Sequence, residues 1–191
     1  MYVTEQFVQS VHMTAQDRRI TKTRKAIYQA FLHLLNQKDY EAITVQEIID
    51  LADVGRSTFY SHYESKELLL DELCQKLFHH LFERAENLSP QDYLAHIFQH
   101  FKKNQDHVTS LLLSKNDYFI RQLQKELKHD VYPMVADELI KSHPTIPHSY
   151  LKHLVVSHFI ETLSWWLKNG KSYTEQEVIQ FYLEILKVGT N

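Results

Sequence analysis

A short polar run at residues 56–63, RSTFYSHY, carries the most distinctive chemistry of the chain. On a helix, Phe59 and Tyr63 are about one turn apart and can face a core together. The side chains left for another partner all offer hydrogen-bonding groups: Arg56, Ser57, Thr58, Tyr60 and His62. Arginine can read guanine edges in the major groove of DNA, serine and threonine reach either base type, and tyrosine hydroxyls reach phosphates. The run therefore favours a surface that binds double-stranded DNA.

The preceding segment has the features of a helix followed by a tight turn. Thr44 and Glu47 form a T-x-x-E capping box at its start. Apolar residues then recur at helical spacing: Val45, Ile48, Ile49 and Ala52. Gly55 can cap a second helix or adopt a positive φ, so the chain can turn sharply and restart at Arg56. Two short helices joined in this way describe a helix-turn-helix, here over about residues 44–63.

Cations lie on both sides of this unit. Residues 18–25, RRITKTRK, contain five cations and no acid, which suits the anchoring of phosphates, although a solvated helix start is the alternative. Lys66 opposes the dipole of the helix that it starts, so a facing phosphate would explain it. The formal net charge of −3 does not exclude DNA binding. Phosphate contacts act locally, within a Debye length of about 8 Å.

Several of these residues carry a resemblance to a known family. The stretch is similar to the N-terminal domain of TetR-family transcriptional regulators, with its aromatic residue, its Thr- or Ser-capped second helix and its motif V-x-x-x-T-φ-Y-x-H-φ-x-x-K-E-x-L. The matching residues are Tyr40, Thr44, Val54, Thr58, Phe59, Tyr60, His62, Tyr63, Lys66, Glu67 and Leu69. Two positions depart from the pattern, because Lys38-Asp39 replaces the usual glycine and Gly55 replaces a frequent serine. The backbone N–H of Gly55 can still contact a phosphate.

The resemblance implies a sequence-specific DNA-binding transcriptional regulator, in the form of a ligand-responsive repressor that acts as a homodimer on a palindromic operator. It implies that the first helix and Thr44 anchor phosphates. The implied base-reading residues are Arg56, Ser57 and Thr58. The implied backbone contacts come from Gly55, Tyr60, His62 and Lys66. The expected partners are therefore an operator, a second copy of the chain and an unknown small-molecule effector.

Composition predicts an all-α fold, because the 191 residues include only three glycines and four prolines. We expect about nine helices. They would form a three-helix DNA-binding domain at residues 14–66 and a larger helical ligand-binding and dimerisation domain at residues 67–191. Pro133 predicts a kink or break near residues 130–132. No apolar run approaches the ~18 residues of a membrane span, and no signal peptide is evident, so we expect a cytoplasmic protein without membrane association.

The last two predicted helices are apolar on more than one side, which one small domain cannot easily bury. A two-fold dimer would bury the excess and hold two reading helices about 34 Å apart. The expected contact residues are Leu151, Leu154, Val155, Phe159, Val178, Phe181, Tyr182 and Ile185. The resemblance implies the same pairing, since the paired tryptophans before Lys168-Asn169-Gly170 are similar to the Firmicutes-type C-terminal domain of the family.

Aromatic residues of the second domain have two interpretations. They could line a pocket for an apolar or amphipathic effector, or they could simply pack as core. The candidates are Phe78, Phe82, Phe98, Phe101, Tyr118, Phe119 and Trp165. We expect no cofactor.

Other chemistry is less well supported by the sequence. His96 and His100 have a spacing that can chelate a cation, but no acidic or cysteine ligand stands near them, so we expect no metal. Cys74 lies in an apolar pattern and is expected to be a buried thiol rather than a redox sensor. No phosphate-binding loop, dinucleotide motif or nucleophile elbow occurs, which disfavours an enzyme. A helical ligand-binding or scaffold protein that has lost DNA binding remains the alternative, with a catalytic site built from distant helices as the least favoured one.

Overall fold

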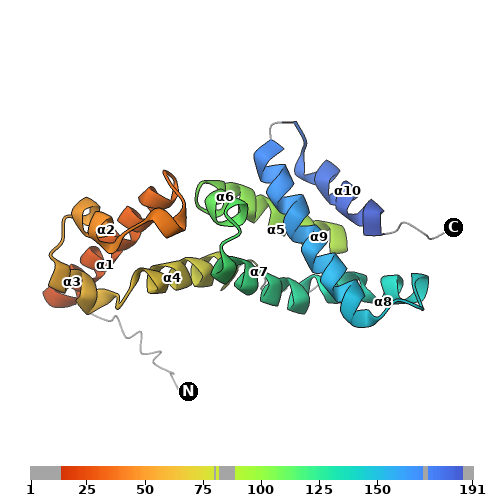
Figure 1. Ribbon diagram of the computed structural model, residues 1–191, viewed down its shortest axis with the longest axis horizontal. Helices are drawn as coiled ribbons and strands as arrows, with labels where there is room; N and C mark the ends of the chain where they lie inside the picture. Colours follow the sequence, from red (N-terminus) through yellow and green to blue (C-terminus); the bar gives the residue numbers. More distant parts are fainter. Residues whose placement is uncertain (1–13, 80, 82–88, 170–171, 187–191) are drawn as a thin grey trace, which may run out of the picture.

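The computed structural model describes residues 14–79, 81, 89–169 and 172–186. Every regular element in these ranges is helical, with ten α-helices and one 3-10 helix, so the prediction of an all-α fold is confirmed. The molecule is elongated, with α1, α2 and α3 at one end and α5 to α10 at the other. Helix α4 runs between the two groups (Figure 1).

The smaller group is built from five segments. They are α1 (Ala15–Leu35), the 3-10 helix Tyr40–Ala42, α2 (Val45–Ala52), α3 (Arg56–His62) and the start of α4 (Lys66–His79). The predicted capping box at α2 is confirmed, because the Thr44 hydroxyl accepts a hydrogen bond from the Glu47 N–H and the Glu47 carboxylate accepts one from the Thr44 N–H. A second box, Thr14 with Asp17, starts α1 and was not foreseen.

The turn between α2 and α3 has the first of the two forms expected for Gly55, which caps α3. Asp53, not Gly55, takes the left-handed conformation, with φ 52°. Gly55 has φ −73° and ψ 153°, an extended conformation that any residue adopts, and it stands at the N-cap of α3. The glycine is therefore not needed for a positive φ.

The larger group contains six helices. They are α5 (Pro90–Lys103), α6 (Gln105–Leu113), α7 (Asp117–Asp130), α8 (Tyr132–Ser142), α9 (His148–Asn169) and α10 (Glu175–Leu186). The break expected near residues 130–132 is confirmed, because α7 ends at Asp130 and α8 starts anew with Pro133 in its first turn. Asn116 caps α7, one residue before the start of that helix.

Helix α4 contacts both groups through side chains that are neighbours in sequence. Asp71 accepts a hydrogen bond from the Tyr118 hydroxyl of α7 at 2.5 Å. Glu72 accepts one from the Tyr63 hydroxyl, at the end of α3, at 2.7 Å. The apolar side of α4, including Cys74, is buried. The connecting helix is thus tied to the rest of the molecule on two sides.

Candidate nucleic-acid interface

Helix α3 presents its polar side chains outward because two aromatic side chains anchor its other face. Phe59 and Tyr63 are buried, with their ring centroids 6.2 Å apart. Tyr60 packs edge-on against Phe59 at 5.3 Å, yet 45% of its surface stays exposed. Of the predicted contact residues on this helix, Arg56, Ser57 and Tyr60 are exposed, whereas Thr58 and His62 are half-buried. The helix therefore offers a guanidinium, hydroxyls and a phenol on one accessible surface.

The N-terminus of α3 is open to an approaching partner. Gly55 is exposed and makes no side-chain cap. The first backbone N–H groups of any helix have no partner within the helix, so those next to Gly55 are available to a phosphate oxygen. A Cβ placed on Gly55 would meet the Thr58 Oγ1 atom at 3.7 Å, an ordinary van der Waals distance.

Thr44 is exposed beside this surface, but its donors are already used. Its hydroxyl donates to Glu47 at 2.9 Å and its N–H donates to the same carboxylate at 2.9 Å. Hydrogen bonds from Lys38 and from Thr44 lower the pKa of Glu47 to about 2. A phosphate at Thr44 would thus compete with a firmly ionised carboxylate.

Lys66 is half-buried, and its ammonium group makes three contacts within the protein. Its Nζ donates to the backbone carbonyls of Tyr40 at 3.1 Å and of Ile43 at 2.9 Å. The same atom lies 4.4 Å from the centroid of the Tyr40 ring. The sequence did not indicate these contacts, because the two carbonyl partners lie 26 and 23 residues away from Lys66.

The basic segment of α1 lies beside the helix-turn-helix, as the contact between Arg24 and Tyr63 shows. Arg24 Nε donates to the Tyr63 hydroxyl at 3.2 Å, and its Nη2 donates to Glu72 at 3.0 Å. The other cations of this segment are exposed: Arg18, Arg19, Lys22 and Lys25. Four of the five cations are therefore placed to meet solvent or an anionic partner, while Arg24 is held by α4.

The expected dimer contacts separate into two sets. Five of them are buried within the subunit and cannot form a contact surface, which corrects the prediction: Leu151, Val155, Phe159, Val178 and Tyr182. Three are exposed: Leu154, Phe181 and Ile185. Tyr150, Trp165 and Tyr173 are exposed as well, and sequence periodicity missed them as members of this surface. Because α9 is apolar on several sides, spacing alone did not tell its inner from its outer face.

A row of rings joins the exposed residues of the two last helices. The Trp165 and Tyr173 centroids are 5.2 Å apart, and those of Tyr173 and Phe181 are 5.7 Å apart. We call Tyr150, Leu154, Trp165, Tyr173, Phe181 and Ile185 the α9–α10 face. An exposed patch that combines four aromatic residues with two aliphatic ones is the kind of surface that marks a protein–protein contact.

The aromatic residues expected to line a pocket are mostly packed as core. Phe98, Phe101 and Phe119 are fully buried, and Phe98 packs on Phe159 and Trp166 at 5.2 and 5.4 Å. Phe78 is buried between Phe101 and Phe119. Trp165 belongs to the α9–α10 face, with 42% of its surface exposed, which corrects its assignment to a pocket. Phe82 lies outside the described residues.

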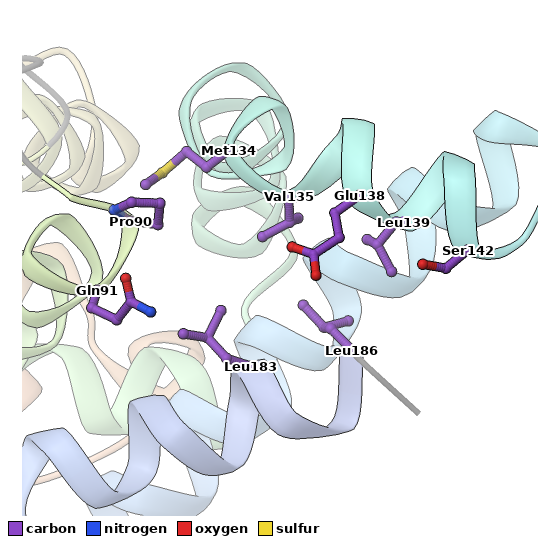
Figure 2. Close-up of a pocket in the computed structure, with 9 residues that line it drawn as sticks. All are labelled: Pro90, Gln91, Met134, Val135, Glu138, Leu139, Ser142, Leu183 and Leu186. Carbon is purple, nitrogen blue, oxygen red and sulfur yellow. The ribbon is translucent and has the colours of Figure 1, made fainter. Parts of the chain in front are cut away.

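Phe78 and Tyr118 each line a separate hollow. Another hollow, lined by none of the predicted aromatic residues, is formed where α5, α8 and α10 meet (Figure 2). Its volume is about 90 Å³. The lining side chains are Pro90, Gln91, Met134, Val135, Glu138, Leu139, Ser142, Leu183 and Leu186. Tyr118, the remaining pocket candidate, lies elsewhere and bonds to Asp71 of α4.

The histidines and the cysteine form no site for metal or thiol chemistry in the described part of the chain. Within the described ranges, no three His, Cys, Asp or Glu side chains are grouped so that they could hold a metal ion. Burial raises the pKa of the Cys74 thiol to about 12, so this thiol stays protonated and poorly nucleophilic. No described helix is both long enough and apolar enough to span a bilayer.

Two protein families match this chain, one in each of its two parts. A family described as bacterial regulatory proteins of the tetR family matches residues 24–73. A second, described as a transcriptional regulator C-terminal region, matches residues 88–187. The first match spans the helix-turn-helix and the second spans α5 to α10.

Individual relatives agree with these matches. The crystal structure of a TetR transcriptional regulator from Streptococcus agalactiae 2603V is 49% identical, with a TM-score of 0.79, and the alignment covers 90% of this chain and 97% of that one. The uncharacterized HTH-type transcriptional regulator YxbF of Bacillus subtilis (strain 168) is 29% identical over 189 residues, 90% of this chain and 46% of that protein.

A third relative is the HTH-type dhaKLM operon transcriptional activator DhaS of Lactococcus lactis subsp. lactis (strain IL1403), 29% identical over 84 residues, 44% of this chain and 45% of that protein. The chain spans about half the length of the curated relatives it matches. Since the family matches cover the helix-turn-helix and the larger helical part alike, the chain belongs to the TetR family of bacterial transcriptional regulators.

Proposed function

We propose that this regulator binds a palindromic operator as a homodimer and that a small-molecule effector changes its affinity for DNA. The outward polar surface of α3 is the observation that supports DNA binding most directly. Phe59 and Tyr63 hold one face of the helix in the core, and Arg56, Ser57 and Tyr60 stay accessible on the other. Seven residues suffice to place such a row of side chains in a major groove.

We assign base reading to Arg56, Ser57 and Thr58, because arginine pairs with guanine edges and hydroxyls reach either base type. Tyr60 and His62 would contact the DNA backbone. Gly55 would contribute its N–H, and the exposed cations of α1 would add phosphate contacts. Thr44 would contact a phosphate only if its hydroxyl gave up the hydrogen bond to Glu47 and donated to a phosphate oxygen instead.

We propose that residues 14–66 recognise DNA and residues 67–191 bind the effector and form the dimer. The α9–α10 face is the proposed contact between subunits, because its exposed aromatic row is continuous across two helices. Two subunits joined there would carry two copies of α3, one for each half-site of a palindrome.

Repression requires no further contact surface, since a dimer bound at a promoter blocks other proteins from the same DNA. We therefore propose a repressor that acts in the cytoplasm. The hollow between α5, α8 and α10 is the proposed effector site, because its lining combines apolar side chains with the polar groups of Gln91, Glu138 and Ser142. An activator is the second candidate for the direction of control, because the relative DhaS is a transcriptional activator.

A selection of bound fragments from the host's genomic DNA, followed by gel-shift titration, tests DNA binding. Arg56→Ala should weaken binding to the selected duplex by about 1–3 kcal/mol, roughly 5- to 150-fold, and relax the preference at one base pair. Tyr60→Ala should weaken binding to all duplexes, because it removes a backbone contact.

Lys141→Ala is the matched control, because it removes an exposed cation from α8 at the far end of the molecule. It should leave the titration unchanged. Unchanged titrations for both Arg56→Ala and Tyr60→Ala would end this assignment. Failure of the wild type to retain any duplex would favour the helical ligand-binding or scaffold alternative, and turnover of a bound ligand would favour an enzyme.

A further inference from the structure

The hollow that Phe78 lines, between α4 and α7, shares no residue with the one proposed as the effector site. Its volume is about 680 Å³. The lining residues are spaced as one face of each helix, at positions 71, 74, 75, 78 and 79 of α4 and at 122, 125, 126, 129 and 130 of α7. Each set extends over about 12 Å, at about 1.5 Å per residue. The hollow is therefore an elongated groove between two helices.

Asp130 is the unusual member of this lining, because its carboxylate is buried and no lysine or arginine of the described residues pairs with it. Its side chain is 8% exposed. Oδ1 lies 3.1 Å from Nδ1 of His129, whose side chain is 84% exposed, and Oδ2 has no hydrogen-bond partner among the described residues. Asp130 is also the last residue of α7, where the negative end of the helix dipole opposes a carboxylate. A carboxylate in this setting is costly unless a positive group pairs with it.

The other side chains of the groove do not supply that positive group. Asp71 and Glu126 add two carboxylates, and Lys125 is the single lysine or arginine among the lining residues that the structure describes. Lys125 is exposed and forms no ion pair with any described residue. The remaining titratable side chains of the lining are His79, His129 and Cys74. Three carboxylates thus share this groove with one ammonium group.

The carboxylates are spread along the groove. Asp71 accepts a hydrogen bond from the hydroxyl of Tyr118, which lies one turn before Gln122, so Asp71 stands at the end near the start of α7. Asp130 stands at the opposite end, because it is the last residue of α7, and the half-buried Glu126 lies one turn before it. This spread agrees with the lack of a metal-binding cluster in the described ranges. Separated carboxylates match a chain with several ammonium groups better than one compact cation.

We propose that this groove binds a linear polyamine, with one ammonium group paired with Asp130 and the others reaching Glu126 and Asp71. Charge-assisted N–H···O bonds would then satisfy the free oxygen of Asp130. The methylene segments would lie against Phe78 and Cys74, which are buried side chains of the lining. The site is separate from the proposed effector hollow, and it does not depend on DNA binding.

Isothermal titration calorimetry of the wild-type protein with spermidine tests the proposal. Spermidine should bind as a single molecule per chain, and 1,4-diaminobutane, which is too short to reach both ends of the groove, should bind more weakly. Asp130→Asn should weaken spermidine binding about 10- to 100-fold, because a hydrogen bond to a charged group is lost. Asp137→Asn, at an exposed aspartate of α8 outside the groove, is the matched control and should keep the wild-type affinity. Equal affinities for Asp130→Asn and the wild type, or equal weakening in both variants, would overturn the proposal.

A compact cation separates a shaped site from general attraction to an acidic surface. Mg²⁺ at the same concentration of charge should displace little spermidine from the wild type, because it cannot reach all three carboxylates at once. Complete displacement by Mg²⁺ would overturn the proposal.

Nuclear magnetic resonance of the wild type covers the case in which Asp130→Asn does not fold. Gln75 and Gln122 line the groove, and Gln91 lines the proposed effector hollow. Spermidine should shift the side-chain amide signals of Gln75 and Gln122 and leave those of Gln91 in place. Unshifted signals of Gln75 and Gln122 at saturating spermidine would overturn the proposal, whether or not the protein binds DNA.

Discussion

At the scale of single residues, the turn that leads into α3 depends on an aspartate. Asp53 ends α2 in the left-handed conformation and lets the chain turn into α3. Aspartate tolerates this conformation better than most residues because its short polar side chain can bond locally. Gly55, two residues later, has ordinary extended torsions and space around its Cα.

Gly55→Ser should therefore be tolerated and slightly stabilising. Serine is a strong N-cap residue, and its hydroxyl can accept a hydrogen bond from the first turn of α3, for a gain of a few tenths of a kcal/mol over glycine. Urea denaturation followed by circular dichroism measures the change. Asp53→Val is the contrasting variant and should cost roughly 1–2 kcal/mol, because a β-branched residue is strained at positive φ. A loss of stability in Gly55→Ser equal to that in Asp53→Val would contradict this account.

Local signals such as capping boxes could be predicted from the sequence because their partners lie three residues apart. Thr44 with Glu47 is one case, and Thr174 with Glu177, which have the same T-x-x-E spacing, form such a box just before α10. The box at Thr14 was missed because aspartate stands where glutamate was sought. The partners of Lys66 could not be predicted, since they lie 23 and 26 residues away and are backbone atoms.

At the scale of elements, the start of α2 is an ionic and hydrogen-bonded junction. Glu47 accepts hydrogen bonds from Lys38 and from both donors of Thr44. Its pKa falls from an ordinary value of 4.5 to about 2, chiefly through the bond from Lys38. Protonation of Glu47 would remove these bonds and loosen the helix that supports α3.

Acid should therefore destabilise this element in a defined pH window. A carboxyl group with a lowered pKa in the folded state contributes stability that is complete above its unfolded value, near 4.5, and is lost as pH falls toward 2. The thermal midpoint of the wild type should drop across that window. Glu47→Gln should show a shallower drop, and its stability should approach that of the wild type at the acid end.

Glu161→Gln is a suitable comparison, because Glu161 is an exposed glutamate of α9 that pairs at 3.7 Å with a highly exposed Lys115. Its profile should follow that of the wild type. Parallel profiles for Glu47→Gln and the wild type would show that the junction contributes nothing to acid stability.

The sequence predicts most helix boundaries among α5 to α10, but it does not predict which apolar residues of these helices are buried. Ser89-Pro90 and Pro133 mark helix starts through backbone chemistry alone. Leu154 and Val155 are both apolar and adjacent, yet one is exposed and the other is buried against neighbouring helices. That difference depends on how α9 is rotated in the bundle, which no local pattern encodes.

At the scale of the whole molecule, α3 and the α9–α10 face lie in opposite halves of an elongated chain (Figure 1). Dimerisation through that face would control how two distant copies of α3 are spaced. Contacts along α4 would carry any change, since Asp71 bonds to α7 and Glu72 bonds to Tyr63 and Arg24.

Ile185→Asp should separate the proposed dimer without unfolding the subunit, because 56% of the Ile185 surface is exposed. Loss of half an isoleucine's burial costs roughly 1 kcal/mol, and a two-fold interface counts it twice, which gives an approximately 30-fold weaker dimer. Light scattering coupled to size exclusion measures the mass over a dilution series. Leu51→Asp, at an exposed apolar residue of α2, should keep the wild-type mass. Equal masses for Ile185→Asp and the wild type at every concentration would exclude this face as the interface.

The two adjacent tryptophans differ in ways that make them natural fluorescent reporters. Trp166 is fully buried and its indole N–H donates to the Tyr173 carbonyl at 3.0 Å, so its emission follows unfolding of the helical bundle. Trp165 meets solvent on the α9–α10 face, so its emission should shift to shorter wavelength when another surface covers it. The intrinsic tryptophan fluorescence of a Trp166→Phe protein would then report subunit assembly without an added dye.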